Sequence, residues 1–135
     1  MARLIESSLW VDFTRRKSPV SLKRLIEPWI LDPAAVLCDP VIFEVLRHAS
    51  RQERGQIEAQ FSTFPILPTP PRIWRDATRL GQTCRDRGFN AGSLDLIIAA
   101  IAIHHKVEVI TFDADFSRIA DASTLMVRLL SRDEA

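Results

Sequence analysis

The sequence predicts an α/β fold, a three-layer sandwich with a mostly parallel central sheet. Short apolar segments of strand length alternate with helical segments along the whole chain, and this alternation is typical of parallel sheets covered by helices. The length of 135 residues suggests one domain, residues 1–135. A hydrophobic share of 47% supplies a core, and a charged share of 26% is ordinary for a globular chain.

The N-terminal half of the chain is predicted to hold two strands and four helices. Leu9 and Phe13 stand four residues apart, which is the spacing of one face of a helix. Further along, Asp39 is predicted to be an N-cap and Pro40 the first helical residue, because this pair is a strong helix-start signal. The predicted order is strand 3–7, helix 8–16, helix 21–30, strand 34–38, helix 39–50 and a polar-faced helix 51–64.

The C-terminal half is predicted to hold three helices, two strands and one extended segment. Its prolines restrict residues 65–71 to a strand or an extended crossover. Gly88 is expected to end a long helix that carries Ile73 and Leu80 on its apolar stripe. The predicted order is segment 65–71, helix 71–88, buried helix 93–105, strand 106–111, helix 113–120 and strand 124–130.

The charge and the cysteine content exclude several functional classes. A formal net charge of +1 gives no global basic field for nucleic acid or membrane, so any site for a polyanion must be local. Cys38 and Cys84 provide neither a disulfide framework nor a zinc knuckle, and both are expected in the core. The sequence contains no recognisable signal peptide and no membrane span, so a cytoplasmic protein with no membrane partner is expected.

Four acidic residues lie at or near the predicted carboxyl ends of strands. Glu6 ends the first strand, and Asp113 lies two residues beyond the strand at 106–111. Glu44 lies on the second turn of the helix that follows the second strand, and Asp95 begins the buried helix. Ligand sites of open α/β sheets collect outside the carboxyl ends of the strands, so the four side chains are expected to converge on one cleft.

Asp95 is the only charge in the apolar run SLDLIIAAIA. If Ser93 is the N-cap, Asp95 takes the second helical position, where the helix dipole stabilises a carboxylate by about 0.3–1 kcal/mol. That gain is small beside the several kcal/mol that burying a charge costs. A partner for Asp95 is therefore expected.

The other acids also have purely structural explanations. Glu6 could be a polar strand end and Glu44 a solvated helix residue. Asp113 or Asp115 could be the N-cap of the helix that follows. Converging carboxylates repel one another unless a cation holds them or one stays protonated. A hard divalent cation, Mg²⁺ or Mn²⁺, is the economical solution, because it prefers oxygen ligands and activates water beside a phosphate.

Three segments together resemble a PIN domain, and more narrowly the VapC toxins of bacterial toxin–antitoxin pairs. They are LIESSLWVDF at the first strand, PVIFEVLRHA in the mid-chain helix and SLDLIIAAIAIHHKVEVITFDADFSRI near the end. The resemblance covers residues 3–127. Residues 93–119 are its most specific part, because the pattern D-x-x-I-A-A-x-A, a strand and then T-x-D-x-D-F is met at every position.

The resemblance implies a PIN-like fold and a small metal-dependent ribonuclease. Its catalytic acids would be Glu6, Glu44, Asp95 and Asp113. Glu6, Asp95 and Asp113 would bind Mg²⁺ or Mn²⁺ directly or through water. Glu44 would bind a second ion or orient the attacking water.

Three further residues belong to the same resemblance. Ser8 and Thr111 would be supporting hydroxyls, and Asp115 would stand just outside the ligand set. In the family the first acid is nearly always Asp, and Glu6 departs from that pattern. Its additional methylene moves the carboxylate by about 1.5 Å at full extension, so either the backbone compensates, the preferred metal differs or activity is reduced. An active nuclease is expected, because the other acids are in place.

The resemblance also implies partners. The family dimerises and is silenced by a cognate antitoxin whose tail enters the acidic cleft, so a homodimer and an antitoxin protein are expected. An apolar groove for an amphipathic helix would come from an exposed subset of four aromatic residues. These are Trp10, Phe13, Trp29 and Phe61.

Local basic residues would have to hold the phosphates of the RNA substrate. Arg15, Arg16 and Lys17 follow the first acid and are the candidates, with Lys23 and Arg24 nearby. The alternative for these residues is a solvated helix end. Single-stranded or looped RNA is the expected substrate, because side chains can reach unpaired bases.

Two other functions compete with the ribonuclease. VITFDADFS is similar to the haloacid-dehalogenase motif, but that motif opens its domain, and here Ser117 replaces Thr or Val with about 20 residues to follow. This phosphotransferase function is rejected. The second is a non-catalytic PIN-like module that binds an antitoxin or RNA without cleavage, and Glu6 is the only feature in its favour.

Overall fold

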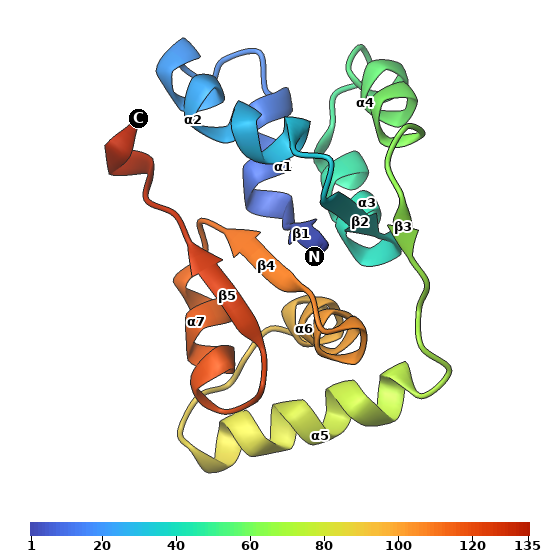
Figure 1. Ribbon diagram of the computed structural model, residues 1–135, viewed down its shortest axis with the longest axis vertical. Helices are drawn as coiled ribbons and strands as arrows, with labels where there is room; N and C mark the ends of the chain where they lie inside the picture. The colour runs from blue at the N-terminus through green and yellow to red at the C-terminus, as the bar shows by residue number, and fades with distance from the viewer.

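The computed structural model describes residues 1–135 and confirms the predicted α/β architecture. The strands of its central sheet are β1 (Arg3–Ile5), β2 (Ala35–Cys38), β3 (Ile66–Leu67), β4 (Glu108–Thr111) and β5 (Met126–Leu129). The five strands follow the order β3-β2-β1-β4-β5, and every neighbouring pair is parallel (Figure 1). The sheet that the sequence predicts as mostly parallel is therefore parallel throughout.

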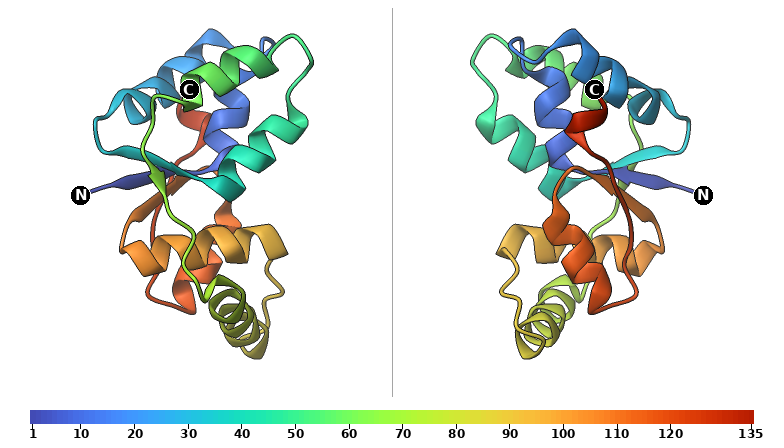
Figure 2. Two further views of the ribbon diagram at one scale, coloured as in Figure 1. Left: turned by 90° about the vertical axis from the view of Figure 1, so that its right-hand side faces the viewer. Right: turned by 90° about the vertical axis from the view of Figure 1, so that its left-hand side faces the viewer.

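Seven α-helices cover the sheet. They are α1 (Ser7–Thr14), α2 (Val20–Leu31), α3 (Asp39–His48), α4 (Arg54–Phe61), α5 (Ile73–Asp86), α6 (Ser93–His105) and α7 (Ala114–Asp121). In side view α1 to α4 lie on one face of the sheet and α5 to α7 on the other, which makes three layers (Figure 2). A short 3₁₀ helix, η1 (Arg132–Glu134), follows β5. None of the helices is both long enough and apolar enough to span a membrane.

The helices that follow the neighbouring strands β1 and β4 lie on opposite faces of the sheet. β1 leads into α1 on one face, whereas its neighbour β4 leads into α7 on the opposite face (Figure 2). Open α/β sheets bind ligands at such a point, outside the carboxyl ends of the strands. Ile5 pairs with Ile110, and the N–H of Glu6 donates to the Ile110 carbonyl at 3.0 Å. Glu6 therefore leaves the sheet beside Thr111.

A cluster of 31 buried apolar residues fills the space between the sheet and the helices. Trp10 of α1 is fully buried, and its ring meets those of Phe61 and Phe64 edge to face, with centroids 4.8 and 5.2 Å away. Cys38 and Cys84 are free thiols within this cluster, as predicted. The aromatic contacts join α1 to the end of α4 and so hold the first turn of α1 against the sheet.

Two predicted helix caps are wrong by one residue. α3 begins at Asp39 itself, because β2 runs directly into the helix and Cys38, the last strand residue, takes the cap position. Similarly, α6 begins at Ser93, because the carbonyl of Gly92 already accepts the first helical hydrogen bond at 3.0 Å. Asp95 therefore occupies the third helical position instead of the second.

Several elements are shorter than predicted. The helix predicted over 51–64 is reduced to the eight residues of α4, which turns flank on both sides. The extended segment 65–71 pairs with the sheet only through the two residues of β3, because its prolines cannot donate to a strand ladder. Gly88, with a φ of 86°, follows α5 as predicted, and Lys106, with a φ of 56°, ends α6.

The edge of the sheet where the strands begin carries paired charges. Arg3 forms an ion pair with Asp32, and its Nε lies 3.6 Å from a carboxylate oxygen of Glu108. Nε of Arg128 on β5 approaches the same Glu108 oxygen at 3.6 Å. Both arginines also lie near the ring of Trp29, at 5.8 and 5.4 Å from its centre. The carboxylates at this edge thus have cationic neighbours.

Candidate active site

Acidic side chains gather around one cavity at the carboxyl edge of the sheet. The cavity has a volume of about 310 Å³. The structure brings the four predicted acids together there, from the end of β1, from α3, from α6 and from the start of α7: Glu6, Glu44, Asp95 and Asp113. The other residues that line the cavity are Ser7, Ser8, Val11, Asp12, Arg15, His48 and Arg132.

Glu6 is almost completely buried, with 4% of its surface exposed. Its Oε1 accepts hydrogen bonds from the hydroxyls of Ser8 and Thr111, both at 2.6 Å. Burial raises the pKa of Glu6 above its usual value, and the two hydroxyl donors lower it by less. Both hydroxyl bonds fall on Oε1, and Oε2 accepts neither of them.

The same two hydroxyls also hold the backbone that follows β4. The N–H of Phe112 donates to Ser8 Oγ at 3.0 Å, and the N–H of Asp113 donates to Thr111 Oγ1 at 2.9 Å. Ser8 and Thr111 thus connect the carboxylate of Glu6 to the turn that presents Asp113. This placement fits the supporting position that the resemblance implies for the two hydroxyl residues.

Replacing Thr111 with valine is expected to destabilise the chain by about 1–3 kcal/mol, because it leaves the part-buried N–H of Asp113 without its acceptor and Glu6 with one donor fewer. Urea denaturation of the purified variant measures the loss. Thr111→Ser is the matched control, since it keeps the hydroxyl at the end of β4. Equal stability of the valine variant and the wild type would show that the hydroxyl does not support this turn.

Asp95 is half-buried in the first turn of α6. Burial is the main cause that raises its pKa from 3.8 to about 7, and the negative charges of Asp113, Glu6 and Glu44 raise it further. Asp95 forms no ion pair with a basic side chain. Its charged neighbours are therefore other carboxylates, and a cation from outside the chain or a proton on one of the acids would relieve their repulsion.

Asp113 serves as a helix cap and also belongs to the acidic group. Its Oδ1 accepts from the N–H of Asp115 at 2.9 Å, which caps α7. One carboxylate oxygen each from Asp95, Asp113 and Asp115 lie within 4.8 Å of one another. Asp115, predicted to stand outside the ligand set, is part of this group, whereas Glu6 lines the same cavity without joining it.

The donor set suits a hard divalent cation. The three grouped side chains offer only carboxylate oxygens, which Mg²⁺ and Mn²⁺ prefer. Ser7 also lines the cavity, but its hydroxyl is buried, in a residue only 2% exposed, and has no hydrogen-bond partner in the protein.

Five residues of the cavity were not expected there from the sequence: Ser7, Val11, Asp12, His48 and Arg132. Asp12 and Arg132 form an ion pair with Nε and Oδ2 2.6 Å apart, although 120 residues separate them. No local sequence pattern predicts a contact between residues so far apart in the sequence. Ser7 carries a weak signal, because it directly follows Glu6 at the end of the strand.

The predicted RNA-binding residues divide between two adjoining cavities. Arg15 lines the acidic cavity together with His48. A neighbouring cavity of about 370 Å³ shares those two residues and adds Arg16 and Lys17. All three basic residues are exposed. A basic surface therefore continues from the rim of the acidic cavity along the end of α1.

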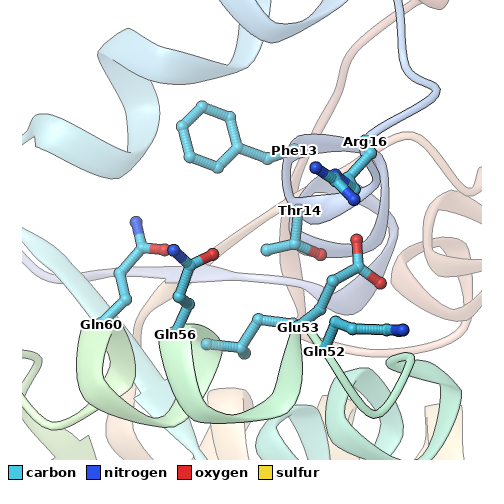
Figure 3. A pocket seen from close by; sticks show the side chains of 8 residues that line it. Phe13, Thr14, Arg16, Gln52, Glu53, Gln56 and Gln60 are labelled. Atoms are coloured by element: carbon cyan, nitrogen blue, oxygen red, sulfur yellow. The ribbon is translucent and has the colours of Figure 1, made fainter.

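A further cavity of about 450 Å³ lies between α1 and α4 (Figure 3). Phe13 and Thr14 reach it from α1, and Gln56 and Gln60 from α4. Its single carboxylate, Glu53, accepts a hydrogen bond from a neighbouring serine hydroxyl. This cavity is larger than the acidic one, but it holds one carboxylate where the acidic cavity holds several.

The four aromatic residues considered for a partner surface differ in exposure. Trp10 and Phe61 are 0% and 4% exposed and belong to the core. Trp29 is half-buried near two arginines, and Phe13 is half-buried in the wall of the cavity between α1 and α4. Only Phe13 therefore contributes an aromatic surface to a cavity in this part of the molecule.

Sequence comparisons place this chain among known proteins. The family model of the PIN domain matches residues 3–122. VapC ribonuclease Mb1587 of Mycobacterium bovis is 30% identical over 130 residues, which cover 90% of this chain and 94% of that protein. Ribonuclease VapC21 of Mycobacterium tuberculosis is 43% identical over 54 residues, 38% of this chain and 39% of the relative.

Solved structures share the fold. VapBC2 of Rickettsia felis, bound to a DNA fragment from its promoter, matches with a TM-score of 0.77 and 18% identity over 97% of this chain and 100% of that chain. VapBC-1 of nontypeable Haemophilus influenzae matches with a TM-score of 0.70 and 19% identity, covering 96% and 98% of the two chains. At these identities the likeness establishes the architecture around the acidic cavity.

Proposed function

This chain belongs to the PIN-domain family, and on that premise we propose that it is a metal-dependent endoribonuclease, the toxin of a toxin–antitoxin pair. The proposal is carried by Asp95, Asp113 and Asp115, whose carboxylate oxygens lie within 4.8 Å of one another at the cavity that Glu6 lines. Relatives that match nearly the whole chain are named ribonucleases. The proposed reaction is hydrolysis of an RNA phosphodiester bond.

Asp95 and Asp113 would hold a Mg²⁺ or Mn²⁺ ion, and Asp115 lies within reach of the same position. When bound, such an ion lowers the pKa of water and stabilises the negative charge that builds on the phosphate. Glu6 lines the same cavity, and its Oε2 accepts neither of the two hydroxyl bonds, which both fall on Oε1. Mg²⁺ and Mn²⁺ are both proposed as the ion at this site.

Glu44 is the residue proposed to orient the attacking water. It reaches the cavity from α3 but is not part of the three-aspartate group. A carboxylate within hydrogen-bond distance of a water molecule aligns it and can accept its proton as the new bond to phosphorus forms. Glu44 reaches the cavity from α3, whereas the three grouped aspartates come from α6 and from the start of α7.

Glu6 takes the place where the family pattern has Asp. The structure gives this longer side chain two anchors, the hydroxyls of Ser8 and Thr111, each 2.6 Å from Oε1. A carboxylate held by two short hydrogen bonds has little freedom, which compensates for the flexibility of the additional methylene. We therefore propose that the chain with Glu6 is an active nuclease.

The basic surface at the end of α1 supports an RNA substrate. Arg15 borders the acidic cavity, and Arg16 and Lys17 extend its positive charge along one direction. Single-stranded RNA follows such a basic path with its phosphates, and its unpaired bases remain accessible. An RNA substrate also accords with the cytoplasmic location predicted from the sequence, which stays a prediction.

Removing divalent ions is expected to stop cleavage of RNA and to lower the thermal stability of the chain above neutral pH. An ion at 100 times its dissociation constant stabilises the folded state by about 2.7 kcal/mol, and without it the grouped carboxylates repel one another. The assay compares purified chain and single-stranded RNA with Mn²⁺, with Mg²⁺, and with EDTA followed by added Mn²⁺. A melting curve under each condition measures the stability.

Undiminished cleavage in EDTA would contradict the metal-dependent reaction. A chain that cleaves no RNA under any condition, yet binds an antitoxin tightly, would favour the non-catalytic module instead. The thermal shift separates these cases further, because it reports ion binding without any need for turnover.

The proposed partners are an antitoxin protein and a second copy of this chain. Two of the solved structures that share the fold are VapBC complexes. The cavity between α1 and α4, with Phe13 in its wall, is the proposed position for an amphipathic segment of the antitoxin (Figure 3). Co-expression with the product of a small neighbouring open reading frame, followed by co-purification and size measurement, tests both partners.

A further inference from the structure

Arg132 reaches the acidic cavity from a part of the chain that is remote in sequence. After β5 the backbone crosses to the side of α1 and forms η1, the red segment at the end of the chain (Figures 1 and 2). Arg132, its first residue, lines the cavity together with Asp95 and Asp113. Its positive charge attracts the phosphate of a substrate, which the surrounding carboxylates repel.

Two contacts fix the guanidinium of Arg132. Its Nε donates to Oδ2 of Asp12 at 2.6 Å, and the side chain of Asp12 is only 12% exposed. Its Cζ lies 4.6 Å from the centre of the Phe112 ring, within cation–π distance. A long, flexible side chain is thus oriented before any substrate arrives, which lowers the entropy lost on binding.

Most of the hydrogen-bonding capacity of Arg132 remains unused. An arginine has five N–H donors in a rigid fork that matches two oxygens of a phosphate. Only Nε–H is taken by the protein, and the side chain stays 51% exposed. Arg132 also forms no ion pair with Asp95 or Asp113, although all three line the same cavity. Its terminal nitrogens therefore take part in no ion pair with these acids.

We propose that Arg132 is a phosphate-binding residue that holds the RNA backbone over the acidic cavity, with Asp12 as its positioning residue. Arg15, on the same cavity, provides a second cation from the end of α1. The substrate phosphate would lie between these cations and the grouped acids. This inference rests on the proposed ribonuclease function and names the residue that binds the negatively charged phosphate of the substrate.

The test measures RNA binding and cleavage by Arg132→Gln. Binding of a short fluorescent single-stranded RNA is measured by anisotropy at several salt concentrations, with Asp95→Asn present in every chain to prevent turnover. The substitution is expected to weaken binding about tenfold and to reduce the slope of log Kd against log salt by about 0.7. In chains that keep Asp95, KM rises while kcat stays near the wild-type value. Arg132→Lys restores part of the binding.

Arg128→Gln is the matched control. The side chain of Arg128 is 52% exposed, close to the 51% of Arg132, and it too contacts one carboxylate and one aromatic ring. Its guanidinium approaches Glu108, the first residue of β4, away from the acidic cavity. Both substitutions remove one positive charge, so only Arg132→Gln is expected to change RNA binding and its salt dependence.

For Asp12→Ala, the expected change in RNA affinity is opposite to the change that charge alone predicts. It removes a negative charge from the cavity wall, and charge alone would strengthen the binding of RNA. Because Arg132 loses the carboxylate that orients it, weaker binding is expected instead. A melting curve for each variant shows that the chain remains folded at the assay temperature.

Equal RNA affinity and equal salt slope for Arg132→Gln and Arg128→Gln would overturn the inference, as would tighter binding by Asp12→Ala. A lower melting temperature of Arg132→Gln with unchanged RNA binding would show a purely structural ion pair and overturn it as well. The proposed function fails separately, when the wild-type chain cleaves no RNA in Mn²⁺ or Mg²⁺. That result is visible before any residue is replaced.

Discussion

Asp95→Asn is expected to reduce metal-dependent RNA cleavage by about 10³-fold or more. The substitution keeps the size of the side chain but removes the charge that brings one carboxylate of the three-aspartate group to the ion. It also leaves the ion with two grouped carboxylates, so its affinity falls. A cleavage assay at saturating RNA, with Mn²⁺ titrated for both chains, measures the two losses separately.

Asp86→Asn is the control for this substitution. Asp86 is an exposed acid at the end of α5, outside the cavity. It undergoes the same chemical change, so its variant should cleave RNA at the wild-type rate. Cleavage by Asp95→Asn at that same rate would contradict the assignment of Asp95 to the metal.

Without divalent ions, Asp95→Asn is expected to be more stable than the wild type above neutral pH. The pKa of Asp95 is raised from 3.8 to about 7, so the folded chain binds more protons than the unfolded chain between these values. The stability of the wild type therefore falls as pH rises through that window, whereas asparagine has no proton to lose. Urea denaturation in EDTA should show the difference at pH 8 and none at about pH 3.

Trp10→Ala is expected to cost about 3–5 kcal/mol of folding free energy, which is a large part of the total for a domain of this size. Trp10 is fully buried, and its edge-to-face contacts with Phe61 and Phe64 join α1 to α4. The substitution leaves a cavity beneath the helix that begins next to Glu6. Urea denaturation measures the loss, and RNA cleavage at low temperature shows whether the site survives it.

Trp10→Phe distinguishes packing from polarity at this position. The indole N–H of Trp10 is buried without a hydrogen-bond acceptor, so its removal relieves an unpaired polar group while most of the ring contact remains. We expect a clearly smaller loss than for alanine. An equal loss from both substitutions would show that the ring edge, and not the filled volume, holds α1 in place.

The fold and the four principal acids were accessible from the sequence because their signals are local. An apolar run such as 93–105 is buried in almost any α/β arrangement, so a carboxylate within its first turn already requires an explanation. Glu6 and Thr111 each directly follow or end a strand, and parallel strands bring such positions to one edge. The resemblance to PIN domains then predicted the chemistry of the site, which stays a prediction.

Other features depend on geometry that no local pattern contains. Asp115 joins the acidic group because Asp113 caps α7 and turns the next residues toward Asp95. The contact of Asp12 with Arg132 depends on where β5 delivers the chain, 120 residues later. The misplaced cap of α3 has a simpler origin, because a strand that runs straight into a helix leaves no room for a separate cap residue.

The paired charges around Glu108, described with the fold, give the molecule an electrical asymmetry along its strands. At the edge where strands begin, Arg3 and Arg128 accompany Glu108. At the other edge, acids outnumber the cations around a single cavity. Substitutions that stabilise the fold by relieving repulsion should therefore cluster at the catalytic edge and reduce activity. Engineering for stability without loss of activity should begin at the opposite edge, where exposed ion pairs contribute at most about 1 kcal/mol each.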